Sequence, residues 1–332
     1  MAERIFRTMR FLLFGIVIIS VLLALLPHIV YLLAKLVGLV AHFRVGYRPF
    51  GIAAFVLVAV WVLTAIYGNV RGRFSHEVKQ VHLAFSNLPA AFDGLRIVHI
   101  SDLHLDGWTG HEKELQQRVD EINALQPDII CFTGDLVSLS PDELKPFVPI
   151  LRQLHGVYAV LGNHDYMPYG RIGVRERNTA VAELVRMERE ELGWTVLLNE
   201  SEVIRRDSDS IAILGCENQS VGAHPVIQRG DLRKALSGNE RTFSILLTHD
   251  PSQWRKEVLP QTNIPLTLSG HTHAMQLRLF GFTPSKWIYP ECDGLYSERE
   301  QHLYVNIGLG GTLPWRIGAT PEITLITLKK NE

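Results

Sequence analysis

The sequence is poor in cysteine and has no excess of charge of either sign. Its three cysteines, Cys131, Cys216 and Cys292, are far apart and form no CxxC pair. An odd number of unpatterned cysteines argues against a disulfide framework and fits a reducing compartment, where each is expected to be a small buried apolar residue. The net charge of −1 gives no general attraction to nucleic acid, so no nucleic-acid partner is expected.

The chain also lacks internal repeats and low-complexity tracts. Its 332 residues allow two or three structural units, at ~100–200 residues per domain. Hydrophobic residues make up 47% of the chain, and their excess lies before residue 71. We therefore expect two transmembrane helices within residues 1–70, a linker over 71–92 that includes a short strand at 77–83, and a soluble catalytic domain over 93–332.

Two stretches near the N-terminus contain almost no charged residues. Residues 11–40 carry one charge, Lys35, and a Pro27-His28 interruption, whereas residues 50–70 carry none. Each stretch is long enough for a spanning helix, which needs ~20 apolar residues. A signal peptide has a shorter apolar core and a cleavage pattern, so a transmembrane hairpin is the better interpretation, with a buried soluble hairpin as the alternative. A channel or transporter is excluded because the second stretch offers no charged pathway.

Basic residues beside these stretches predict their orientation. Six lie at the outer ends, namely Arg4, Arg7, Arg10, Arg71, Arg73 and Lys79, and three lie between, namely Lys35, Arg44 and Arg48. Cytoplasmic flanks of membrane helices carry the excess of Lys and Arg. Both ends of the hairpin are therefore expected on the cytoplasmic side of an inner or plasma membrane, and the catalytic domain with them.

Beyond residue 93 the pattern alternates between short apolar strands and amphipathic helices. Strands are expected within residues 95–102, 127–135, 156–165, 195–199, 202–206, 211–218, 243–251, 264–273, 302–308 and 322–328. Helices are expected at 111–126, at 140–154 with Ser140 and Glu143 as a capping box, and up to Gly193. Mixed strands with covering helices predict an α/β (α+β) fold, a two-sheet β-sandwich flanked by helices.

Five of the expected strands end in polar clusters, and in three of them a glycine comes just before the polar residues. The clusters are Asp102-Leu103-His104, Gly134-Asp135, Gly162-Asn163-His164-Asp165, Thr248-His249-Asp250 and Gly270-His271-Thr272-His273. Any one of them is compatible with ordinary loop residues. Together they form an N/O ligand set without thiolate, which suits Mn, Fe or Zn. Seven ligands exceed the needs of one catalytic ion and suit two ions ~3.5–4 Å apart with a bridging carboxylate.

The motif order DLH, GD, GNHD, THDP, GHTH resembles the calcineurin-like metallophosphoesterase superfamily over about residues 94–327. The resemblance implies the calcineurin-like fold and a metal-dependent phosphoric ester hydrolase with two divalent metal ions as cofactors. It implies that Asp102, His104 and His273 hold one ion, that Asn163, His249 and His271 hold the other, and that Asp135 bridges them. Such ions activate water and offset charge at phosphorus.

The same resemblance makes His164 the catalytic residue, because it would face the substrate and protonate the leaving oxygen. Asp165 would either orient His164 or serve as a turn carboxylate, and Asp250 is expected to be structural. Asn306, with nearby glycines, is expected to shape a loop and contact substrate. Arg316 would either contact a phosphate or pair with Glu322, and the pair is preferred. Four aromatic residues would form a wall for acyl chains or simply pack in the core, namely Trp108, Trp287, Trp315 and Tyr289.

The motifs SDLHL and GDLV differ from the GDxHG and GDxVDRG of serine/threonine protein phosphatases. With the apolar hairpin and the closing segment 305–328, they look more like the bacterial membrane-anchored branch, which includes a UDP-2,3-diacylglucosamine pyrophosphatase. The expected partners are membrane lipids and a phosphodiester, phosphomonoester or pyrophosphate substrate, either lipid-linked or a nucleotide sugar. The alternative is a non-catalytic membrane scaffold or sensor. It ranks low because every motif position is present.

Overall fold

A computed structural model describes residues 2–170, 172–220 and 227–331, which divide into two compact units. The first unit extends to Phe74 and also includes Leu313–Gly318, whereas the second contains Ser75–Thr312 and the chain from Ala319 onward. The second unit therefore begins earlier than the expected catalytic domain, because part of the 71–92 stretch is one of its strands.

The first unit is built on two apolar helices, α1 (Ala2–Val40) and α2 (Arg48–Tyr67), and α2 continues into the π-helical turn η1 (Gly68–Gly72). Gly15–Val40 and Arg48–Gly72 are long and apolar enough to cross a membrane. The Tyr47 hydroxyl bonds His28 Nε2 at 2.7 Å, and Trp61 Nε1 donates to the Ile16 carbonyl at 3.3 Å. The helices thus contact each other, as a hairpin requires.

The segment Leu313–Gly318 belongs to this first unit. The Trp315 ring meets the edge of Trp61 at 5.9 Å, and the Asn69 amide donates to the carbonyl of Pro314. Arg316 is buried, and its backbone N–H donates to the Gly68 carbonyl at 3.2 Å.

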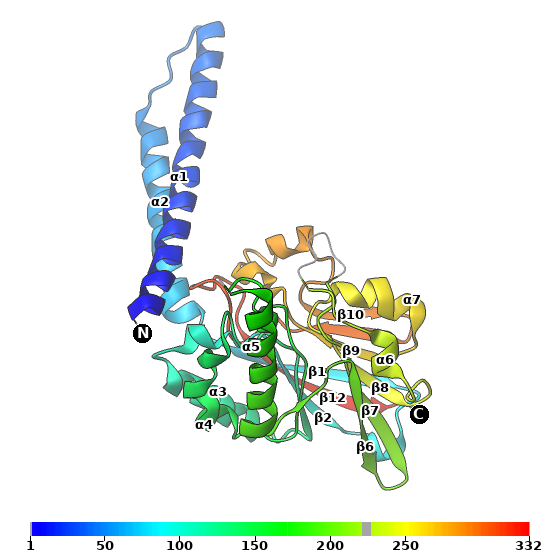
Figure 1. Ribbon diagram of the computed structural model, residues 1–332. Coiled ribbons are helices and arrows are strands. Elements are labelled where there is room, and N and C mark those ends of the chain that lie inside the picture. The colour runs from blue at the N-terminus through cyan, green and yellow to red at the C-terminus, as the bar shows by residue number, and fades with distance from the viewer. Residues whose placement is uncertain (1, 171, 221–226, 332) are drawn as a thin grey trace. The chain divides into compact units, whose positions relative to one another are not determined.

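The second unit contains two six-stranded mixed sheets (Figure 1). In order across the first sheet, the strands are β1 (Glu77–Phe85), β12 (Glu322–Lys330), β2 (Arg96–Ile100), β3 (Ile129–Phe132), β4 (Val157–Ala159) and β5 (Thr195–Val196). Across the second they are β10 (Gly294–Glu298), β11 (Gln301–Val305), β9 (Leu266–Ser269), β8 (Phe243–Leu247), β7 (Asp209–Gly215) and β6 (Glu200–Arg206). The helices are α3 (Glu112–Ala124), α4 (Val148–Leu151), α5 (Val174–Arg186), α6 (Leu232–Leu236) and α7 (Leu259–Gln261).

Alternating apolar residues of both sheets form the main core. Ile97, Cys131, Ile245, Leu268 and Ile326 are among the residues of this core. A second apolar cluster covers the other face of the second sheet, where Leu214, Leu246 and Val305 pack with Trp254 and Val258. Two sheets that each bury one face against the other give the sandwich expected from the sequence.

The strand ends at one edge of each sheet carry the polar clusters. β2, β3 and β4 are parallel neighbours in the first sheet, and β8 and β9 are parallel neighbours in the second. Parallel neighbours end at the same edge, so the residues that follow them are brought together.

All three cysteines are free and buried, as expected.

Two local predictions differ from the structure. The helix expected at 140–154 is broken into two 3₁₀ turns and α4, because Pro146 and Pro149 lack the N–H that a continuous helix needs. Ser140 does cap the first turn, but the Glu143 carboxylate reaches further back than a capping box and accepts the N–H groups of Ser138 and Leu139. Strand β10 was not expected.

A buried carboxylic acid lies after α5, in the π-helical turn η7 (Met187–Glu191). Glu188 is buried, and neither of its carboxyl oxygens has a hydrogen-bond partner among the residues that the structure describes. Burial, and next the negative charge of Asp165, raises the pKa of Glu188 well above its usual range. The side chain therefore keeps its proton in the folded state at pH values where the unfolded chain has lost it.

This raised pKa predicts that Glu188 weakens the fold as pH increases. Its favourable contribution is fully present below the unfolded pKa and is lost as pH rises toward the folded pKa, by up to about 1.4 kcal/mol per pH unit. Glu188→Gln cannot ionise, so its thermal midpoint should fall less than that of the native chain between pH 5 and pH 8. Scanning calorimetry of the detergent-solubilised proteins measures this. The exposed Glu300→Gln serves as control and should match the native chain. Equal pH slopes in all three proteins would contradict the assignment.

Candidate metal centre

Side chains from all five strand ends converge on one small volume of the second unit. Two donor groups, each with its N and O atoms within 4.8 Å of one another, can be defined there. The first contains Asp102, His104, Asp135 and His273, and the second contains Asp135, His249 and His271. Asp135 is common to both groups. Its position between them is the feature on which the rest of the site depends.

The first donor group is buried and closely spaced. His104 Nε2 lies 3.2 Å from His273 Nε2, and Asp102 Oδ1 lies 3.3 Å from His273 Nε2. Asp135 Oδ2 is 3.5 Å from His104 Nε2. The lone pairs of these nitrogens and carboxylate oxygens would repel one another if nothing lay between them. A cation bound among them removes that repulsion, so the group is a favourable environment for a metal ion.

The second group is arranged in the same way on the other side of Asp135. His249 Nε2 lies 3.2 Å from Asp135 Oδ2 and 3.2 Å from His271 Nδ1. His249 Nδ1 donates to the Thr133 carbonyl at 2.7 Å, which leaves Nε2 as the nitrogen that can bind a metal. His271 Nε2 bonds the Tyr289 hydroxyl at 2.7 Å, which leaves Nδ1 for the same purpose.

Two buried oxygens provide a test of whether the residues fit divalent ions. Asn163 Oδ1 and Asp102 Oδ1 accept no hydrogen bond from any part of the chain that the structure describes. Buried oxygens without donors are unfavourable unless a cation or water satisfies them. The Asn163 amide nitrogen donates to the Tyr169 hydroxyl at 3.4 Å, which orients the oxygen. An N/O donor set with unsatisfied oxygens fits divalent metal ions.

The charges at Asp135 are consistent with a ligand role. Burial acts to raise the pKa of Asp135, but the nearby His249, His164 and His104 outweigh it and hold that pKa well below its usual range. Burial acts to lower the pKa of His249, but Asp135 and Asp102 raise it to about 10. A metal must displace the proton of His249, so metal binding should become tighter as pH rises.

Asp165 supports the site through the backbone. Its buried carboxylate accepts the N–H groups of Asp135 and Gly162 at 2.8 Å and that of Val137 at 3.1 Å. It therefore ties the second and third motifs together, which agrees with the turn-carboxylate interpretation rather than with a role in orienting His164. Asp250 accepts the Ser252 N–H at 2.9 Å, which agrees with its expected structural role.

The backbone at the site is held in an unusual conformation. Five of the residues brought together have positive φ, namely Asp102, His104, Asp135, His271 and His273. A non-glycine residue in this region is unfavourable and persists only where its surroundings enforce it. The Asp102 N–H donates to Gly134 O at 2.9 Å and the His104 N–H to Asp135 O at 3.0 Å, so the loops hold each other in place.

Glycines allow these loops to approach closely. A Cβ at Gly162 would lie 2.2 Å from Asp135 Oδ1, and a Cβ at Gly270 would lie 1.9 Å from Ser101 Oγ. Gly310 is as constrained, since its Cβ would meet the Leu103 carbonyl at 1.8 Å. The glycines before the polar residues therefore serve the close approach expected of them.

His164 lies at the edge of the cluster. Its backbone N–H donates to Asp135 Oδ1 at 2.8 Å, and its Nδ1 bonds the Ser138 carbonyl at 3.0 Å. This leaves Nε2 directed away from the backbone. The ring packs 4.6 Å from Tyr169 and 4.8 Å from His104. Ser138 and Tyr169 were not identified from the sequence, because no motif marks them. Glu143, predicted only as part of a capping box, accepts the Ser138 N–H and so supports this contact.

Asn306 and Arg316, the two residues considered for substrate contact, differ in their surroundings. Asn306 is fully buried, and its amide nitrogen donates to the His99 carbonyl at 3.1 Å and to Thr324 Oγ1 at 3.0 Å, so it shapes the closing loop rather than facing a ligand. Glu322 pairs with Lys79 of the neighbouring strand β1. Arg316 itself belongs to the first unit.

The four aromatic candidates differ in their surroundings. Trp108 is buried and donates to the Leu103 carbonyl at 2.9 Å, and Trp315 belongs to the first unit. Tyr289 contacts His271, whereas Trp287 is exposed.

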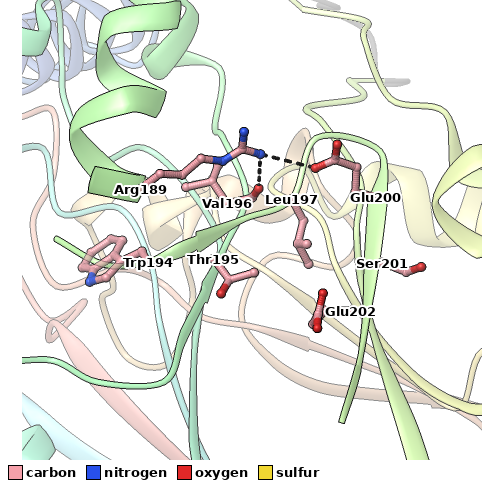
Figure 2. A pocket seen from close by; sticks show the side chains of 8 residues that line it. All are labelled: Arg189, Trp194, Thr195, Val196, Leu197, Glu200, Ser201 and Glu202. Atoms are coloured by element: carbon pink, nitrogen blue, oxygen red, sulfur yellow. Dashed lines mark hydrogen bonds and ion pairs between the residues drawn. The ribbon is translucent and has the colours of Figure 1, made fainter. Parts of the chain in front are cut away.

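The hollow drawn in Figure 2 contains none of the candidate site residues. It has a volume of about 560 Å³ and is lined by residues of η7, β5 and β6 and the turns beside them. Its guanidinium, Arg189, donates to the Val196 carbonyl at 2.6 Å and to Glu200 at 3.3 Å (Figure 2). Because the Arg189 guanidinium is already paired with Glu200, the hollow offers no donor set comparable to that of the metal centre.

The fold and the paired donor groups define a metal-dependent phosphoesterase, and comparison with known proteins agrees. Residues 95–275 match the family model described as calcineurin-like phosphoesterase. The chain belongs to this calcineurin-like metallophosphoesterase family and is a metal-dependent phosphoric ester hydrolase.

Three relatives match most of the chain. An uncharacterized metallophosphoesterase of Bacillus subtilis, YkuE, is 34% identical over 86% of this chain and 98% of that protein. A transmembrane protein with metallophosphoesterase domain from Danio rerio is 32% identical over 84% of this chain and 62% of its own length. The UDP-2,3-diacylglucosamine pyrophosphatase LpxG of Chlamydia trachomatis is 30% identical over 81% of this chain and 94% of that protein. Transmembrane relatives and two apolar helices indicate association with a membrane.

Proposed function

We propose that the chain is a membrane-anchored hydrolase that cleaves a phosphate ester or pyrophosphate bond with two divalent ions. Asp102, His104 and His273 would hold one ion. Asn163, His249 and His271 would hold the other, and Asp135 would bridge them. When bound, such ions activate water and neutralise charge that develops at phosphorus. Manganese, iron or zinc suits this donor set.

The observation that carries this proposal is the position of Asp135 between two sets of imidazoles. One oxygen, Oδ2, lies 3.5 Å from His104 and 3.2 Å from His249. The other, Oδ1, accepts the His164 N–H and so fixes the carboxylate plane. A single cation would satisfy only one of these groups, whereas two ions that share Asp135 satisfy both.

His164 is the residue proposed to donate a proton to the leaving oxygen. Its Nδ1 is held by the Ser138 carbonyl, which orients the ring and leaves Nε2 for the substrate. Its backbone N–H is bonded to Asp135, so its position is coupled to that of the bridging carboxylate. Proton donation of this kind is needed when the leaving oxygen is a poor leaving group.

We infer that the substrate is an amphiphilic phosphate compound, such as a lipid-linked pyrophosphate or nucleotide sugar. The likeness to LpxG and the two apolar helices support this substrate class. A hairpin anchor keeps an active site at the lipid surface, where such molecules are concentrated. The excess of basic residues outside the hairpin supports a cytoplasmic position for the catalytic unit.

The bridging role predicts the behaviour of Asp135→Asn. This change keeps the shape of the side chain and removes its charge, so neither ion retains its shared ligand. Elemental analysis should find well under two metals per chain, and hydrolysis of bis-p-nitrophenyl phosphate with added Mn²⁺ should fall by at least ~10²-fold.

The matched control for this change is Asp142→Asn. Asp142 is an exposed carboxylate that pairs with Lys145, outside the donor groups. This variant should keep both its metals and its turnover. Two metals and normal turnover in Asp135→Asn would eliminate the bridging assignment.

Proton donation by His164 predicts a dependence on the leaving group. His164→Asn should retain both metals and lose ~10²–10⁴-fold in kcat on an alkyl phosphodiester, whose alkoxide needs a proton. The loss should be smaller on bis-p-nitrophenyl phosphate and on a pyrophosphate, because their leaving groups are already stable anions. Steady-state kinetics on the three substrates measures this. Equal losses on all three would instead assign His164 to phosphate binding, and loss of metal would assign it as a ligand.

The proposed orientation is tested by reporter fusions. Alkaline phosphatase fused to the C-terminus, which is active only outside the cytoplasm, should stay inactive, and a fluorescent protein that folds only in the cytoplasm should be bright. The opposite pair of results would place the catalytic unit on the other side of the membrane.

A further inference from the structure

An apolar finger, residues 279–288, projects from the second unit shortly after the fifth motif (Figure 1, orange). Its sequence is LFGFTPSKWI. Five large apolar side chains are exposed on it, with exposed fractions of 107% for Phe280, 79% for Trp287, 51% for Leu279, 45% for Ile288 and 44% for Phe282. Single exposed apolar residues are common, but a contiguous group marks an interaction surface.

The tip of the finger is a tight turn that displays an aromatic ring. Leu279 and Phe282 exchange backbone hydrogen bonds at 2.9 Å in both directions, and the two residues between them, Phe280 and Gly281, have φ of 50° and 80°. Both central residues of such a turn need positive φ, which glycine adopts easily and a bulky residue does not. Phe280 occupies the strained position without burying its ring in the chain.

The base of the finger is tied to the metal centre. Thr283 Oγ1 donates to the Ala274 carbonyl at 2.6 Å, directly after His273, and Thr272 donates to the carbonyl of Cys292 at 2.5 Å. The residue that follows the finger, Tyr289, bonds His271. The position of the exposed apolar side chains is therefore fixed relative to the metal donors.

The charges of the finger suit an anionic lipid surface. Residues 279–288 contain no Asp or Glu, and Lys286 is exposed beside Trp287. Arg278, at the start of the finger, pairs with Asp293. Aromatic rings beside a lysine are typical of segments that lie at the boundary between lipid headgroups and acyl chains.

We propose that the finger inserts into the headgroup region of the bilayer that holds the apolar hairpin. Only residues 73–76 separate Gly72, the end of the second apolar stretch, from Glu77 at the start of β1. Four extended residues reach at most about 14 Å, so the second unit cannot leave the lipid surface. This tether favours lipid as the occupant over a second copy of the chain. The inference depends on the membrane part of the proposed function and not on the reaction.

The consequence of this insertion is that the metal centre is held close to the bilayer surface. Because Tyr289 and Thr283 connect the finger to His271 and Ala274, anchoring the finger would present the metal donors to molecules embedded in the bilayer. An amphiphilic substrate would then reach the site without leaving the membrane. The proposal therefore adds a route of entry for the proposed substrate class: along the lipid surface beside the finger.

The test uses the full chain in nanodiscs of phosphatidylglycerol and phosphatidylcholine, labelled at Phe280→Cys with an environment-sensitive fluorophore. The three native cysteines are buried, so labelling is selective. The control is Ser208→Cys, an exposed residue in the turn of the β6–β7 hairpin, far from the orange segment in Figure 1. Circular dichroism and the thermal midpoint check that each variant folds, which is expected because Phe280 has no packing to lose.

The label at position 280 should show blue-shifted emission and at least twofold quenching by lipids that carry a doxyl group near the headgroup. The label at position 208 should show neither. Equal exposure of both labels to aqueous quencher would overturn the proposal. Blue-shifted emission without doxyl quenching, together with cross-linked dimers, would also overturn it and assign the finger to contact between chains. Neither readout involves hydrolysis, so loss of the proposed activity would leave this test intact.

Discussion

The shared position of the Asp135 carboxylate is the constraint on which the site depends. One oxygen faces His104 and His249, and the other accepts the N–H of His164. A carboxylate in this position must be ionised, and the surrounding imidazoles keep it so despite burial. The two donor groups are therefore one electrostatic unit, in which the geometry of each half is set by the same side chain.

Much of the second unit serves to hold that carboxylate in place. Asp165 accepts the N–H of Asp135, and Gly162 leaves room for the carboxylate because a Cβ there would overlap it. Positive φ at Asp135 and at four neighbouring donors is unfavourable locally, at about 1–3 kcal/mol for each strained residue. The packed core of two sheets and the hydrogen bonds between loops offset this strain, so the stable sandwich and the strained site are parts of one arrangement.

Two exposed apolar surfaces support the proposed position of this chemistry at a membrane. The helices of the first unit expose large apolar side chains such as Leu39 and Phe55, which water would solvate poorly. The finger at 279–288 exposes a second group, tied to the metal donors through Thr283 and Tyr289. We propose that the first surface keeps the protein in the bilayer and that the second aligns the metal centre with the bilayer surface.

The sequence by itself determined the apolar helices, the alternating strands and the polar clusters at the strand ends. These depend on local patterns: a run of apolar residues, a period of two, and polar residues directly after a strand. It did not reveal the supporting residues Ser138 and Tyr169, which carry no motif, and it assigned Glu143 to a capping box although its carboxylate accepts the N–H groups of Ser138 and Leu139. It also overestimated the helix at 140–154, which Pro146 and Pro149 interrupt.

Tertiary structure alone decided which side chains share a contact. Asn306 follows a strand as the donors do, but it bonds His99 and Thr324 inside the sandwich. Lys79 lies in a stretch expected as a linker, yet it pairs with Glu322 because β1 and β12 are neighbours in the sheet. Spacing along the chain cannot show such pairs, since they arise from strands distant in sequence that meet only when the two sheets pack together.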